Sequence, residues 1–104
     1  MSKRPQLVEV SSAELRQMFN DGRYYARTNI GELSEKLLRE GHPSPPRSKQ
    51  PPCTRSQIIA YFDARGRKVA IVHQYLRPDN TLGGSGQPDP KTLFHEDRLY
   101  VARP

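Results

Sequence analysis

Residues 55–76 read RSQIIAYFDARGRKVAIVHQYL, and this stretch decides the fold. Both of its arms are rich in the β-branched and aromatic residues that favour strands, and the four residues DARG at 63–66 are typical of a turn. The stretch therefore predicts a β-hairpin with strands at Arg55–Phe62 and Arg67–Leu76.

The second of these strands has two different faces. Val69, Ile71, His73 and Tyr75 share one face, and the residues between them share the other. If the first face covers the core, His73 is a hydrogen-bonded core residue. If that face opens into a cleft, His73 and Tyr75 can meet a ligand, and the sequence leaves both interpretations open.

The segment that follows, residues 77–91, reads RPDNTLGGSGQPDPK and is more elaborate than a connection between strands requires. Its glycine run LGGSG either presents successive backbone N–H groups to a phosphate or forms a flexible turn, and its spacing is not that of a P-loop. The prolines on either side of Asp89 stiffen the exit and hold Asp89 and Lys91 in place. There, Asp89 either orients Arg77 or caps a turn.

The two ends of the chain add further strands. Residues 92–94 and 99–101 are short apolar runs that flank residues 95–98, and they indicate either a last hairpin or one interrupted strand. Near the N-terminus, the alternating run Leu7–Val10 predicts an edge strand.

Two helix signals follow the first strand. Ser11 with Glu14 three residues later is a capping box, and it predicts a helix that ends at Gly22. Asn29 with Glu32 repeats the pattern. It predicts a second helix that ends at residue 41, with an apolar stripe of Ile30, Leu33, Leu37 and Leu38.

Two connections complete the chain. Residues 23–27, RYYAR, join the predicted helices, and their tyrosines either stack on bases or lie half-buried over the core. Residues 43–52 form a proline-rich loop, either a spacer or a contact with a polyanion or a partner protein. The sum is one α+β domain spanning residues 1–104, in the order β-α-α-β-β-β, with two helices packed on one face of a small antiparallel sheet.

The positive charge is concentrated in the middle of the chain. The net charge is +6, and residues 42–78 alone contribute seven basic residues against one acidic residue. A polyanion is therefore the expected partner, and RNA is favoured over DNA. The predicted nucleic-acid-binding residues are Arg47, Lys49, Arg55, Arg65, Arg67, Lys68, Gly84 and Ser85.

A row of reactive side chains runs along the second hairpin strand. Cleavage of RNA without a metal needs a base for the 2′-hydroxyl, a proton donor for the leaving oxygen and cations at the phosphorus. His73, Tyr75 and Arg77 lie at alternate positions, and the loop returns Lys91. These four residues are the predicted catalytic group.

The element order resembles the RelE-like and barnase-like fold of small bacterial toxin ribonucleases. The segment YLRPDNTLGGSGQPDPK, Tyr75 to Lys91, resembles a segment of small uncharacterised bacterial proteins. The first resemblance implies a role with nucleic acid through topology alone.

Several classes of function are not supported by the sequence. The three histidines are scattered and no His/Cys pair has ligand spacing, so neither a metal nor a cofactor is predicted. A lone cysteine, no signal peptide and no membrane-spanning run predict a cytoplasmic protein without a membrane partner.

The main hypothesis is a basic nucleic-acid-binding protein, extending to an RNA-cleaving toxin. The alternative is a non-catalytic protein-interaction module, such as a phage or mobile-element inhibitor or an immunity-type partner, that binds through residues 43–52.

Overall fold

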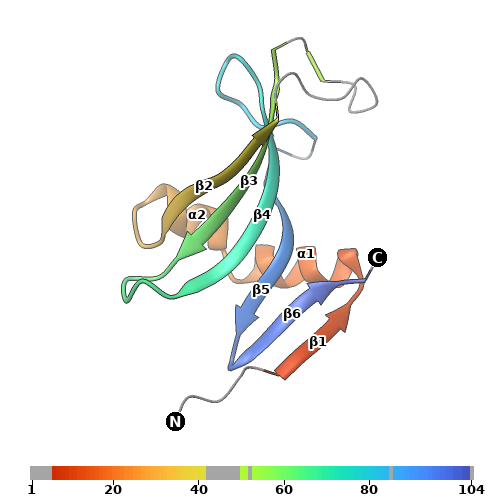
Figure 1. Ribbon diagram of the computed structural model, residues 1–104, viewed down its shortest axis with the longest axis vertical. Helices are drawn as coiled ribbons and strands as arrows, with labels where there is room; N and C mark the ends of the chain where they lie inside the picture. The colour runs from red at the N-terminus through yellow and green to blue at the C-terminus, as the bar shows by residue number, and fades with distance from the viewer. Residues whose placement is uncertain (1–5, 42–49, 52, 85, 104) are drawn as a thin grey trace.

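The computed structural model describes residues 6–41, 50–51, 53–84 and 86–103. Six strands form one sheet in the order β1-β6-β5-β4-β3-β2, and both helices lie on one side of it (Figure 1). The α+β prediction is confirmed. The elements are β1 (Gln6–Val10), α1 (Ser12–Asp21), α2 (Tyr24–Asn29), β2 (Ser34–Gly41), β3 (Arg55–Phe62), β4 (Lys68–Leu76), β5 (Asp89–His95) and β6 (Arg98–Ala102).

The sheet is mixed, so the prediction of a wholly antiparallel sheet is wrong. The edge strand β1 runs parallel to β6, with Gln6 opposite Arg98, and every other neighbouring pair is antiparallel. Strands joined by a tight turn must be antiparallel, but β1 and β6 are separated by most of the chain. Their relative direction is therefore not fixed by any local turn.

The β3–β4 and β5–β6 hairpins form the inner strands of the sheet, and each has a turn with a conformation that favours a hairpin. The predicted β3–β4 hairpin is confirmed, and the Asp63 carboxylate accepts hydrogen bonds of 2.9 Å from the backbone N–H groups of Arg65 and Arg67. Residues 92–101 form a hairpin of β5 and β6, not one interrupted strand. Its turn residues Glu96 and Asp97 have φ angles of +50° and +64°, which match the twist of the flanking strands.

Helix α1 begins as predicted and covers the core. The Ser11 hydroxyl accepts a 3.0 Å hydrogen bond from the Glu14 backbone N–H. Leu15 and Phe19, four residues apart on one helix face, are fully buried. The Phe19 ring lies 5.6 Å from that of Tyr24 in α2, so the two helices and the sheet share one apolar cluster.

The predicted second helix at residues 30–41 is wrong. Residues 34–41 are strand β2, which pairs with β3, and α2 lies earlier, beginning inside the predicted connection 23–27 and ending two residues beyond it. Gly31 has a φ of +84°, and Leu33 is buried while Leu37 and Leu38 are about half exposed. The backbone N–H and C=O groups on the side of β3 away from β4 need hydrogen-bond partners, and the backbone of β2 supplies them. This backbone pairing does not depend on the spacing of the apolar side chains in β2. A helix over these residues would gain stability mainly by packing its apolar stripe on a core, and here that gain is smaller than the gain from strand pairing.

Candidate functional site

Strand β4 places the His73 side chain on the opposite side of the strand from its buried core residues. Ala70 and Val72 point into the core, whereas His73 and Tyr75 lie on the opposite face and are only half-buried. The His73 Nε2 atom lies 2.8 Å from the Ser56 Oγ atom on the neighbouring strand. The His73 and Tyr75 rings meet edge to face at 4.7 Å. Of the two interpretations that the sequence left open, the structure therefore favours the cleft.

A pocket of about 310 Å³ lies where β5 separates from β4; we call it the His73 pocket. His73, opposite Asp89, is the last residue of β4 that pairs with β5. Beyond this pair the loop crosses over, and the Gly83 N–H donates a 2.8 Å hydrogen bond to the Tyr75 carbonyl. The pocket is lined by Arg16, His73, Gln74, Tyr75, Gly83, Gly84, Gln87 and Asp89.

Asp89 is held between two cations at this pocket. Its carboxylate lies 3.7 Å from the Arg16 guanidinium and 3.2 Å from the Lys91 Nζ atom. Partial burial and the positive charge of Lys91 lower the pKa of His73, and Asp89 opposes them. The His73 ring is therefore neutral at pH 7 and can accept a proton.

Gly83, in the glycine run, lies close to the side chain of Gln50. A Cβ atom on Gly83 would lie 2.5 Å from the Oε1 atom of Gln50, so a larger residue here would force the Gln50 side chain to move. The same Gln50 oxygen accepts a 3.1 Å hydrogen bond from the Arg77 Nε atom. Arg77 is thereby held by Gln50, and the described lining of the His73 pocket does not include it. Of the predicted catalytic group, the structure brings together His73 and Tyr75, with Lys91 beside them through Asp89.

Four of the predicted nucleic-acid-binding residues, all of them cations, lie in two separate places. Arg65, Arg67 and Lys68, the tip cations, lie at the turn of the β3–β4 hairpin, and the Arg67 Nε atom is 3.0 Å from the Asp63 carboxylate. Arg55 lies at the far end of β3 and is 3.7 Å from Glu40. The described cations of residues 42–78 are therefore divided between two ends of the molecule.

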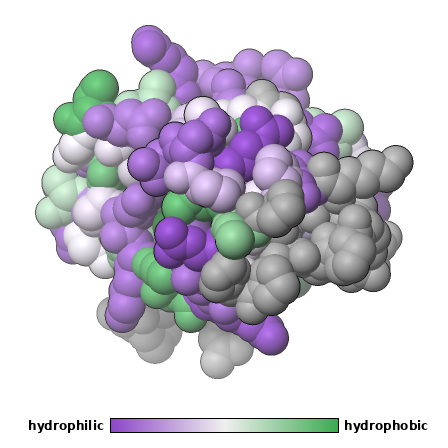
Figure 2. Space-filling view, turned by 90° about the horizontal axis from the view of Figure 1, so that it is seen from above, coloured by the Kyte–Doolittle hydropathy of each residue, from purple (hydrophilic) through white to green (hydrophobic). Residues whose placement is uncertain are grey.

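Several predicted residues are not described. Arg47, Lys49 and Ser85 lie outside the described part of the chain, and so does the proline-rich segment 43–52 apart from residues 50 and 51. Gly84 is described, and it lines the His73 pocket with a φ of +68°. Seen from the end of the molecule that carries the loops, hydrophilic side chains cover much of the surface between smaller apolar areas (Figure 2).

The described residues form neither a metal-binding cluster nor a membrane-spanning helix. Within residues 6–41, 50–51, 53–84 and 86–103, no group of three His, Cys, Asp or Glu side chains could hold a metal ion. In those same ranges neither helix is long and apolar enough to cross a membrane. No family model, curated protein or solved structure matches this chain. The case for a function therefore depends on the geometry of the pocket.

Two residues of the site were missed by sequence reasoning. Arg16 is an exposed residue of α1 that reaches Asp89 from the helix side, and nothing in its local sequence marks it. Ser56 lies on the same face as His73 because its cross-strand partner is Tyr75. The predicted hairpin register could have identified Ser56 as a neighbour of His73.

Proposed function

We propose that this protein binds single-stranded nucleic acid at the His73 pocket, RNA in preference to DNA, and cleaves RNA without a metal ion. The observation that carries the proposal is that one pocket joins a neutral histidine, a tyrosine and the exposed Gly84 with the cations around Asp89. A phosphate bound there would meet positive charge from Arg16 and Lys91.

The chemistry assigns a role to each side chain. His73 removes the proton from the ribose 2′-hydroxyl, whose oxygen attacks the adjacent phosphorus. Arg16 and Lys91 stabilise the charge on the phosphorane, and Tyr75 gives its proton to the leaving 5′-oxygen as the P–O5′ bond breaks. The products are a 2′,3′-cyclic phosphate and a 5′-hydroxyl. DNA has no 2′-hydroxyl, and this supports RNA as the substrate.

The Ser56 hydroxyl has a supporting role. It lies 2.8 Å from the His73 Nε2 atom and so fixes the orientation of the ring and the nitrogen that faces the pocket. Ser56 is a positioning residue in this scheme, because it acts through His73.

The experiment that tests the proposal is cleavage of a labelled, unstructured RNA in the presence of EDTA. The wild type should cleave it and should leave the 2′-deoxy analogue intact. His73→Ala should abolish cleavage while circular dichroism shows that the protein stays folded. His95→Ala is the matched control, because His95 is an exposed residue of β5 beside the β5–β6 turn. No binding of RNA at low salt, or cleavage that survives His73→Ala, would contradict the proposal.

A further inference from the structure

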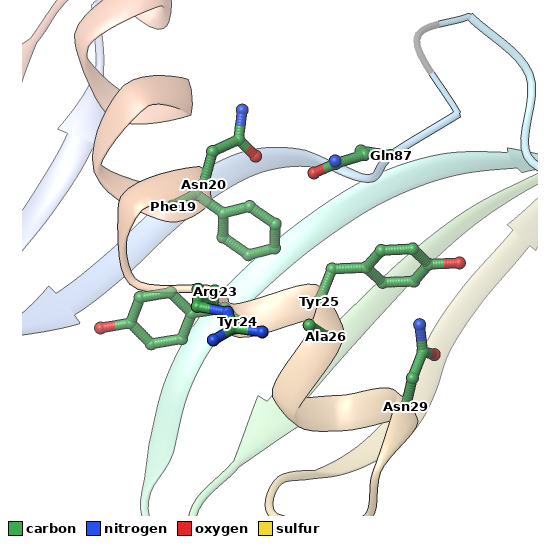
Figure 3. Close-up of a pocket in the computed structure, with 8 residues that line it drawn as sticks. All are labelled: Phe19, Asn20, Arg23, Tyr24, Tyr25, Ala26, Asn29 and Gln87. Atoms are coloured by element: carbon green, nitrogen blue, oxygen red, sulfur yellow. The ribbon is translucent and has the colours of Figure 1, made fainter.

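A second pocket, of about 270 Å³, lies between the two helices and the loop that leads into β5 (Figure 3); we call it the Tyr25 pocket. Phe19 and Tyr24 form its buried wall. Three amide side chains also line it: Asn20, Asn29 and Gln87. Gln87 lines the His73 pocket as well, so the two pockets adjoin at this residue.

The polar groups of this pocket are available to a ligand. Asn20, Asn29 and Gln87 are exposed, and within the described part of the chain their side chains make no hydrogen bond. Arg23 adds a guanidinium, and its φ of +56° is an uncommon backbone conformation for a bulky residue. Strained backbone of this kind is concentrated at functional sites.

These side-chain types match one class of ligand. Asn and Gln make paired hydrogen bonds with N6 and N7 of adenine, and Arg makes them with O6 and N7 of guanine. Both sets of atoms lie on the same edge of a purine. Pyrimidine bases lack N7, so they cannot make either pair.

The tyrosine that gives the pocket its name supplies an aromatic surface. Tyr24 is used by the core, where its ring stacks on Phe19, but Tyr25 is only half-buried. In the view of Figure 3 the Tyr25 ring extends between the side chains of Gln87 and Asn29. A base that stacks on this ring would present its edges to the amides.

The spacing along α1 joins the two pockets into one path. Arg16 and Asn20 are four residues apart, so they lie on one helix face about 6 Å apart along the axis. A cavity of 270 Å³ lies below the usual range for small-molecule sites, about 300–1,000 Å³, and suits a single base.

We infer that the Tyr25 pocket binds an unpaired purine base of the strand whose phosphate lies in the His73 pocket. The inference rests on the proposed function and adds a preference for sequence to it. Tyr25 stacks on the base, and Asn20, Asn29 and Gln87 bind its edge.

The test measures the binding of short oligonucleotides of A, U or C by fluorescence anisotropy. The oligonucleotides carry 2′-O-methyl groups, so they cannot be cleaved. The wild type should bind oligo(A) roughly tenfold more tightly than oligo(U) or oligo(C), since one paired contact to a base edge discriminates by roughly five- to 150-fold. Asn29→Ala with Gln87→Ala should remove the preference, and Gln6→Ala, an exposed amide on β1, should keep it.

Tyr25 provides a second measurement. Tyr25→Ala should weaken binding of oligo(A) by roughly tenfold, and Tyr25→Phe should restore it, because stacking needs the ring and not the hydroxyl. If the wild type binds all three oligonucleotides equally and Tyr25→Ala changes nothing, the inference is overturned while the proposed function stands. If the wild type binds none of them and no RNA, the proposed function fails and the inference fails with it.

Discussion

The placement of charge predicts how RNA binding should depend on salt. Three cations lie at or beside the two adjoining pockets: Arg16, Arg23 and Lys91. Each phosphate neutralised on a single strand contributes about −0.7 to the slope of log K against log salt. Three contacts give a slope of about −2, which is a loss of roughly twentyfold in affinity between 50 and 200 mM salt.

The tip cations should not contribute to this slope. Lys68 and Tyr75 are seven residues apart on β4, which is about 23 Å along a strand. The Debye length is about 10 Å at 0.1 M salt, so a charge at the hairpin tip is screened from the His73 pocket. If instead all seven basic residues of segment 42–78 bound phosphates, the slope would be about −5 and the loss roughly a thousandfold.

Anisotropy titrations with a labelled RNA at several KCl concentrations distinguish the two cases. Arg16→Ala should make the slope less steep by about 0.7, and Arg65→Ala should leave it unchanged. Arg16 and Arg65 are both exposed, so neither substitution opens a cavity in the core. A slope near −5, or an Arg65→Ala variant that flattens it as much as Arg16→Ala, would refute the assignment of binding to the pockets.

Three further predictions concern stability and titration. Leu15→Ala removes a fully buried side chain and should lower the free energy of unfolding by about 3 kcal/mol, seen as a fall of roughly 12–24 °C in Tm. NMR titration should find the pKa of His73 below its ordinary value, and Lys91→Met should raise it. Because the unfolded chain then binds the proton at higher pH than the folded chain, the contribution of His73 to stability should be lost as pH falls below about 6.5, in a urea titration at several pH values. Replacing the turn residues by Glu96→Asn and Asp97→Gly should raise the free energy of unfolding by about 1 kcal/mol, since both have left-handed φ angles; an unchanged urea midpoint would argue against strain in that turn.

The β3–β4 hairpin and the start of α1 could be predicted because their signals are local. Ser11 and Glu14 are three residues apart, and the hairpin turn is organised by Asp63 within four residues of itself. Each interaction joins residues within one short segment, so the sequence pattern that predicts it contains both partners of the contact.

Strand β2 could not be predicted in the same way. Asn29, taken as the start of a helix, is the last residue of α2, and Glu32 forms an ion pair with Arg27. The partner that makes residues 34–41 a strand is β3, more than ten residues further along the chain. At an exposed edge the side chains bury little, so their period carries almost no information about the backbone pairing.

The candidate site combines these two situations. His73 and Tyr75 could be predicted as neighbours because alternation along one strand is local. Arg16 could not, because its approach to Asp89 depends on how α1 packs on β5 and on the register shift between Ile71 and Val72 where β4 pairs with β5. A helix residue with no local mark becomes part of the pocket only when the sheet has been assembled. It follows that Arg16→Ala is the most informative test of the pocket. If RNA bound to the β3–β4 hairpin alone, substitution of Arg16 would not affect binding.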